Sequence, residues 1–219
     1  MVITTASGKT MTVHRARDLS ALTGNRIDAG WTPATFTGRL CEFVARSGTP
    51  WLTLLCRLIL NAQRGEEPVA WITLTEDTFY PPDFSANGVN LSRLTTIFAP
   101  DLRRASRSAE HLLRSGAFGL VILQLDANSL PDAALGRLGS LCEQYNAALL
   151  LVTSSTRADA SRRTLGSLIS LRLESRIRAA RATEVTEGRF VCELLVTKDK
   201  LNGPGRTYTE VCSGLPGLR

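Results

Sequence analysis

The chain has 219 residues, of which 43% are hydrophobic and 21% are charged, and no apolar run is long enough to cross a bilayer. This composition predicts one soluble domain with a sizeable core and excludes a membrane-spanning chain. Lysine and arginine exceed aspartate and glutamate by 26 to 20, which fits either a polyanionic partner such as nucleic acid or a solvated basic surface.

Residues 1–30 are predicted to form an N-terminal arm whose structure the pattern leaves open, although Val13, Leu19 and Leu22 are spaced to line a short helix. Residues 31–219 are predicted to form a single core domain. Apolar strand-like runs alternate there with helical patterns, which is typical of an α/β fold with a mostly parallel sheet flanked by helices. The expected strands are 39–44, 69–74, 95–99, 120–125 and 149–153, and the expected helices are 52–63, 101–114 and 131–145.

The pattern changes from Leu168 onward. Three strand-like runs follow without helices between them, at residues 168–175, 189–197 and 207–213. The turn signals Glu187-Gly188 and Asn202-Gly203-Pro204-Gly205 separate these runs. We therefore expect an antiparallel C-terminal extension of the sheet.

Residues 38–53 have the layout of a strand that leads into a phosphate-binding loop and a helix. A working loop of this kind needs glycines, so that backbone N–H groups can wrap the phosphates, a lysine for the β and γ groups, and a serine or threonine for Mg²⁺. The expected lysine and the paired glycines are missing from this stretch.

The strand Gly-Arg-Leu-Cys-Glu-Phe at residues 38–43 resembles the Gly-Arg-(Ile/Leu)-x-Glu-(Ile/Phe) strand of the RecA family. Five further stretches resemble that family in the same order, at residues 62–64, 69–72, 87–94, 113–117 and 196–201. Tyr-Pro-Pro-Asp-Phe at 80–84 and Leu-Leu-Arg-Ser-Gly-Ala-Phe at 112–118 are most similar to the ImuA family. These are RecA-like accessory proteins of a damage-inducible mutagenesis cassette, so the resemblance implies a RecA-like fold.

The resemblance also implies a degenerate nucleotide site. Trp51 stands where the family has its lysine, and Gln124 stands where it has the Mg²⁺ carboxylate; a neutral amide is a poor ligand for a hard cation. Asp126 would restore a carboxylate if the register shifted, and Glu76 remains a candidate for the catalytic glutamate. The full set of altered positions is Ala45 and Pro50 for the loop glycines, Trp51 for the lysine, Leu52 for the serine or threonine, Gln124 for the carboxylate, and Thr153 and Ser154 for the γ-phosphate sensors.

We therefore expect no catalytic residues, no cofactor and no metal. Pro50 and Trp51 either fill a vacated phosphate pocket, or Trp51 is an aromatic anchor for a partner.

Two loops bind DNA in active RecA proteins. The first corresponds to residues 127–131, which are too few to enclose a strand, and the second corresponds to residues 154–165. Polar, arginine-bearing loops suit phosphate contact, although a solvated surface remains the alternative reading. The DNA-binding candidates are Arg157, Arg162 and Arg163 in the second loop, followed by Arg172, Arg176 and Arg178. Lys198 and Lys200 match positions that reach a neighbouring ATP site in the family, and here fit an acidic protein partner or ordinary surface charge.

The predicted function is that of a non-catalytic accessory or adaptor protein in error-prone translesion DNA synthesis. The resemblance implies binding to the ImuB-type Y-family-like polymerase subunit, to RecA and to DNA, with no membrane partner and with self-association left open. One alternative is a divergent RecA-like NTPase that uses Glu76 and Asp126. The other is a regulator of RecA or of cell division that has no polymerase partner.

Cysteine spacing bears on the cellular compartment. The five cysteines are scattered singly without a Cys-x-x-Cys pair, and the chain has two histidines, which argues against a zinc site or a disulfide framework. No secretory signal is evident at the N-terminus. We expect a cytoplasmic protein whose thiols are reduced and mostly buried, at Cys41, Cys56, Cys142, Cys192 and Cys212.

Overall fold

The computed structural model describes residues 2–4, 10–12, 33–74, 79–126, 129–155, 165–178 and 189–213. Near the N-terminus, β1 (Val2–Thr4) and β2 (Thr10–Thr12) pair antiparallel as a separate two-stranded sheet, with Val2 opposite Thr12. The short helix expected around residues 13–22 lies outside the described residues.

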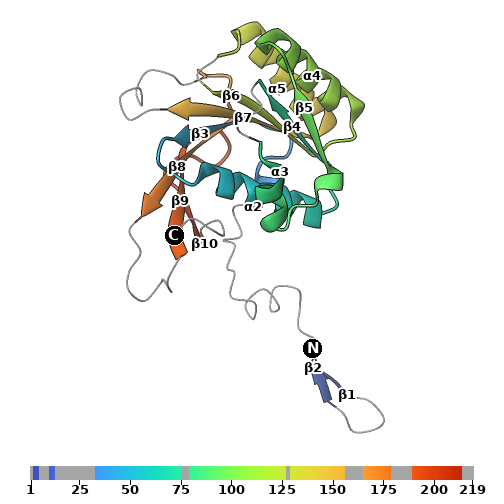
Figure 1. Cartoon of the computed structure of the whole chain (residues 1–219), viewed down its shortest axis with the longest axis vertical. Helices are drawn as coiled ribbons and strands as arrows, with labels where there is room; N and C mark the ends of the chain where they lie inside the picture. The colour runs from blue at the N-terminus through green and yellow to red at the C-terminus, as the bar shows by residue number, and fades with distance from the viewer. Residues whose placement is uncertain are drawn as a thin grey trace.

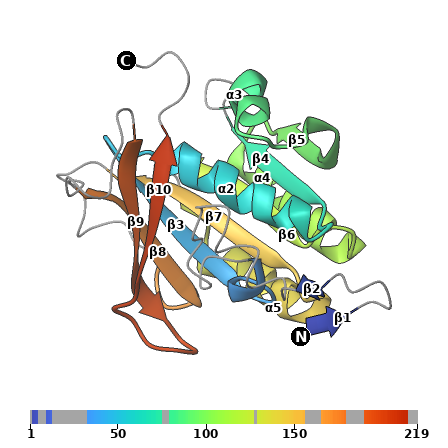
Figure 2. The same cartoon turned by 90° about the horizontal axis from the view of Figure 1, so that it is seen from below.

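The core of the molecule is one eight-stranded sheet. Its strand order is β10-β9-β8-β3-β7-β6-β4-β5. Figures 1 and 2 show β10 and β9 at one edge and β5 at the other. The strands are β3 (Leu40–Arg46), β4 (Val69–Thr73), β5 (Leu94–Phe98), β6 (Leu120–Asp126), β7 (Ala148–Ser155), β8 (Leu171–Arg178), β9 (Arg189–Asp199) and β10 (Thr207–Ser213). The expected α/β class, with a mostly parallel sheet and antiparallel C-terminal strands, is confirmed.

The antiparallel pairing begins between β8 and β9, where the first turn signal predicted it. Strand β8 pairs parallel with β3, with Cys41 opposite Leu171, and antiparallel with β9, which in turn pairs antiparallel with β10. A parallel neighbour needs a long crossover connection rather than a tight hairpin. The chain between Ser155 and Leu171 is long enough to provide one, whereas the apolar pattern of a strand does not reveal its direction.

Helices cover both faces of the sheet. Figure 1 shows α2 and α3 on one side, and α4 and α5 on the other. The helices are α2 (Trp51–Arg64), α3 (Pro81–Ala86), α4 (Leu102–Ser115) and α5 (Asp132–Tyr145), with short 3-10 helices η1 (Pro33–Thr35) and η2 (Leu91–Arg93). In the described part of the chain, no helix combines the length and apolarity that a membrane crossing requires.

Two buried clusters hold these layers together, because alternate residues of each strand face opposite sides of the sheet. Under α2 and α3, Trp71 meets Phe84 edge to face with ring centroids 5.5 Å apart. Under α4, small and branched residues at helical spacing, Ala105, Ala109 and Leu113, pack closely on the sheet. The two clusters fix the carboxyl ends of the parallel strands, where ligand sites of open α/β sheets are found.

Candidate functional site

The turn between β3 and α2 is the place where the family resemblance puts a nucleotide. The backbone N–H of Thr49 donates to the carbonyl of Arg46 at 3.2 Å, and the Thr49 hydroxyl donates to the same oxygen at 2.7 Å. Gly48 has φ +76°, a left-handed conformation that favours glycine. The chain therefore closes on itself in one tight turn before α2 begins.

The altered nucleotide-site positions flank this turn. Ala45 is buried inside β3, and Pro50 caps α2 without an N–H group to offer a ligand. Trp51 and Leu52 are the first two residues of α2, and both are half-buried against the cluster under that helix. An indole and an isobutyl group thus occupy the positions where the family has an ammonium group and a hydroxyl group.

The remaining altered positions lie at the carboxyl ends of β6 and β7. Gln124 is buried, Ser154 is exposed, and the Thr153 hydroxyl donates to Oε1 of the buried Glu42 at 3.3 Å. The pairing of β6 with β7 shifts register between Gln124 and Asp126. The side chain of Asp126 and all of Glu76 lie outside the described residues, so their proposed roles stay predictions.

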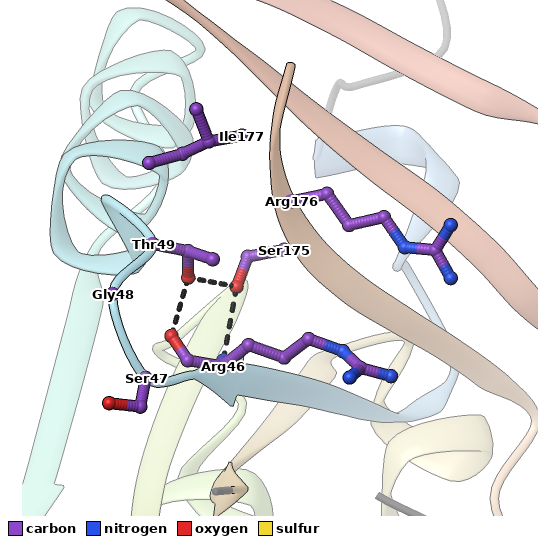
Figure 3. Close-up of a pocket in the computed structure, with 7 residues that line it drawn as sticks. All are labelled: Arg46, Ser47, Gly48, Thr49, Ser175, Arg176 and Ile177. Atoms are coloured by element: carbon purple, nitrogen blue, oxygen red, sulfur yellow. Dashed lines mark hydrogen bonds between the residues drawn. The ribbon is translucent and has the colours of Figure 1, made fainter. Parts of the chain in front are cut away.

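A cavity of about 320 Å³ opens beside the turn, between the carboxyl ends of β3 and β8. Figure 3 shows the Thr49 and Ser175 hydroxyls meeting over the backbone of Arg46. These hydroxyl oxygens are 2.6 Å apart, and Ser175 Oγ also accepts from the Arg46 N–H at 3.2 Å. Arg46 itself donates to Glu174 Oε2 at 2.7 Å. The two hydroxyls of this cavity therefore bond to each other and to the backbone of Arg46, and Ile177 adds an apolar wall.

Arg172, a candidate DNA contact, lies mostly buried and forms an ion pair within the protein. Its Nε donates to Glu42 Oε2 at 2.6 Å, and the Arg172 side chain is only 13% exposed. The ammonium of Lys198, opposite Arg172 in the sheet, donates to the carbonyls of Gly166 and Ser167 at 3.1 and 3.0 Å. Partial burial, together with the nearby Arg172 charge, lowers the pKa of Lys198. The ion pair of Arg172 with the buried Glu42 suits a structural role better than phosphate contact.

The other arginine candidates divide by position. Arg176 is exposed and pairs with Glu174 at 3.5 Å, whereas only the backbone of Arg178 is described. Arg157, Arg162 and Arg163 lie outside the described residues, as do the first two residues of the shortened first loop. DNA contact by these arginines stays a prediction.

Sequence reasoning missed a second buried charge cluster. Asp199, at the end of β9, accepts from Arg39 Nη2 at 2.6 Å and from the backbone N–H of Leu201 at 2.9 Å, and it also pairs with Arg206. Arg39 further donates to the hydroxyl and the carbonyl oxygen of Ser170. The sequence signal for this cluster was a charged residue, Arg39, directly before an apolar strand. Nothing in the sequence indicates that its partner is the distant Asp199.

The chemistry of the described residues includes no preassembled metal site, since no group of three or more His, Cys, Asp or Glu side chains in this part of the chain could hold an ion. The sequence matches no protein-family model, and no curated protein matches it significantly. The functional argument therefore depends on the residues themselves.

Proposed function

We propose that the chain is a non-catalytic RecA-like adaptor in error-prone translesion DNA synthesis, related to the ImuA family. It acts in the cytoplasm by binding the ImuB-type polymerase subunit, RecA and DNA. Two arguments support the proposal. The family resemblance of the sequence suggests the process and the partners, and the geometry of the β3–α2 turn supports a non-catalytic role.

The closed turn is the observation that carries this proposal. A phosphate-binding loop must keep its backbone N–H groups pointed at the ligand. Here the Thr49 N–H is used within the turn, the Arg46 N–H is used by Ser175, and Pro50 has none. The half-buried Trp51 begins the helix where a phosphate-binding lysine would be needed.

The altered positions should weaken the binding of a triphosphate strongly. Charge-assisted hydrogen bonds to a triphosphate contribute about 1.5–3 kcal/mol each and offset its desolvation. Loss of the lysine, the loop donors and the metal carboxylate removes several of them together. The parallel sheet then remains as a scaffold that presents surfaces to other macromolecules.

The cytoplasmic part of the proposal is supported by the thiols. Cys41, Cys56, Cys142 and Cys192 are free and buried. Burial raises the pKa of Cys142 to about 12, which keeps it a protonated and unreactive thiol at neutral pH. Such cysteines are typical of proteins from reducing compartments.

Co-purification tests the partner assignment. The tagged chain is mixed separately with the purified ImuB-type subunit, with RecA and with a cell-division filament protein, and retention is measured at two salt concentrations. We expect retention of the ImuB-type subunit. Retention of the division protein in its place would contradict the proposal and favour a division regulator.

A further inference from the structure

A second hollow lies on the face of the sheet opposite α2, between α4 and α5. These helices are neighbours on that face (Figure 1), and the hollow between them has a volume of about 380 Å³. We call it the α4–α5 groove. Leu102, Leu130 and Ala134 form its apolar part, and Arg103, Arg107 and Arg137 form its rim.

Small side chains at facing positions create this groove. Ser106 on α4 and Ala134 on α5 both line it and are themselves nearly covered. Residues 103, 106, 107 and 110 share one face of α4, because residues three and four apart are neighbours on a helix. That face differs from the one that Ala105, Ala109 and Leu113 bury against the sheet. The groove is thus a surface that the sheet does not use.

The charge of the rim is positive. Arg137 Nε lies 3.2 Å from Glu110 Oε1, so this arginine is already paired within the groove. Arg103 and Arg107 are exposed, and neither forms an ion pair with another residue in the part of the chain that the structure describes. Two uncompensated guanidinium groups therefore flank an apolar hollow.

We propose that the α4–α5 groove binds an acidic segment of another protein chain, which places one bulky apolar side chain in the hollow. Carboxylates on either side of that anchor meet Arg103 and Arg107, since guanidinium groups bind carboxylates with two parallel hydrogen bonds. An apolar anchor in a pocket with a charged rim is the usual arrangement of a short-segment interface.

Charge and composition favour a protein over the other occupants. None of the described residues that line the groove is aromatic, so a nucleic-acid base has no ring there on which to stack. The two terminal segments of this chain, residues 1–32 and 214–219, both carry a net positive charge and do not complement the rim. The inference involves no residue of the β3–α2 turn and does not depend on the proposed function.

Selection from a random peptide library displayed on phage tests the inference on the full chain. Enriched peptides are synthesised with a fluorescent label, and their affinities are measured by anisotropy. We expect the enriched sequences to combine acidic residues with a leucine or aromatic residue. The double variant Arg103→Glu, Arg107→Glu should weaken their binding about tenfold or more, because two attractive contacts become repulsive.

The matched control is the double variant Arg104→Glu, Arg114→Glu. It changes the net charge of the same helix equally at exposed positions outside the groove, and it should alter the affinity less than about twofold. Equal losses in the two double variants, or enrichment of basic or uncharged peptides, would overturn the proposal. So would a failure to enrich any peptide. If the chain binds single-stranded DNA and only the variant Arg103→Glu, Arg107→Glu loses this binding, the groove is a nucleic-acid site instead.

Discussion

Replacing Asp199 with asparagine should destabilise the fold strongly. The carboxylate is completely buried and accepts from Arg39, from Arg206 and from the backbone N–H of Leu201. Asparagine keeps the shape but removes the negative charge and turns one acceptor into a donor. The Arg39 guanidinium, only 7% exposed, then remains buried without its counter-ion.

The expected cost follows from this geometry. Removing one partner of a buried ion pair costs about 3–5 kcal/mol, because the remaining charge stays desolvated. For a chain of this size each kcal/mol shifts Tm by about 2–4 °C, so Asp199→Asn should lower Tm by about 10 °C.

The same carboxylate predicts a pH dependence. Burial alone would raise the pKa of Asp199, but hydrogen bonds from Leu201, Arg39 and Asn202 outweigh it and lower the pKa from 3.8 to about 2. The folded state therefore favours the charged form. Its contribution of about 2 kcal/mol is complete above about pH 4 and is lost as the pH falls toward about 2. The free-energy gap between wild type and variant should narrow over this range.

Urea unfolding followed by tryptophan fluorescence measures both effects, at neutral pH and at several acidic pH values. The control Glu143→Gln removes an exposed carboxylate and should change the free energy of unfolding by less than about 0.5 kcal/mol. If Asp199→Asn costs no more than this control, or if the gap between wild type and variant does not narrow at acidic pH, the buried cluster is not the stabilising feature that its geometry indicates.

Two further predictions concern the arginines. Arg172→Met should lower the free energy of unfolding by about 3–5 kcal/mol, because it leaves Glu42 buried without its ion-pair partner. The double variant Glu42→Leu, Arg172→Met should recover most of this loss, as measured by urea titration of the two variants. A double variant that is no more stable than the single variant would contradict the role of this ion pair. The triple variant Arg157→Ala, Arg162→Ala, Arg163→Ala should weaken binding to all single-stranded DNA sequences and flatten its salt dependence, as measured by anisotropy across salt concentrations. The control is the triple variant Arg64→Ala, Arg104→Ala, Arg114→Ala, which removes three exposed arginines outside the loop and the α4–α5 groove. Unchanged affinity of the loop variant would move the DNA site elsewhere.

The central strands were predictable because their apolar runs are long and uninterrupted. Strands β4 and β6 begin at the predicted residues, and β3 begins within one residue of prediction. Such runs are the signature of parallel strands buried on both faces. The six-residue helix α3 was missed because Phe84 is its only buried residue, so no periodic pattern marks it.

Contacts between residues far apart in the chain could not be predicted from the sequence. Arg39 and Asp199 are 160 positions apart, and nothing local to either residue indicates the other. The sequence analysis made no prediction of the neighbour of β8 in the core, since the parallel pairing with β3 depends on the path of the connection rather than on the strand itself. The altered nucleotide-site positions could be predicted from the family pattern. The hydrogen bond from the Thr49 N–H to the Arg46 carbonyl, which closes the turn, could be found only in the structure.

Titration of ATP into the chain by calorimetry, with Mg²⁺ at millimolar concentration, tests the central claim most directly. The closed turn and the half-buried Trp51 predict no saturable heat and no release of inorganic phosphate on long incubation. Saturable binding in the micromolar range, accompanied by phosphate release, would contradict the account and favour a divergent NTPase.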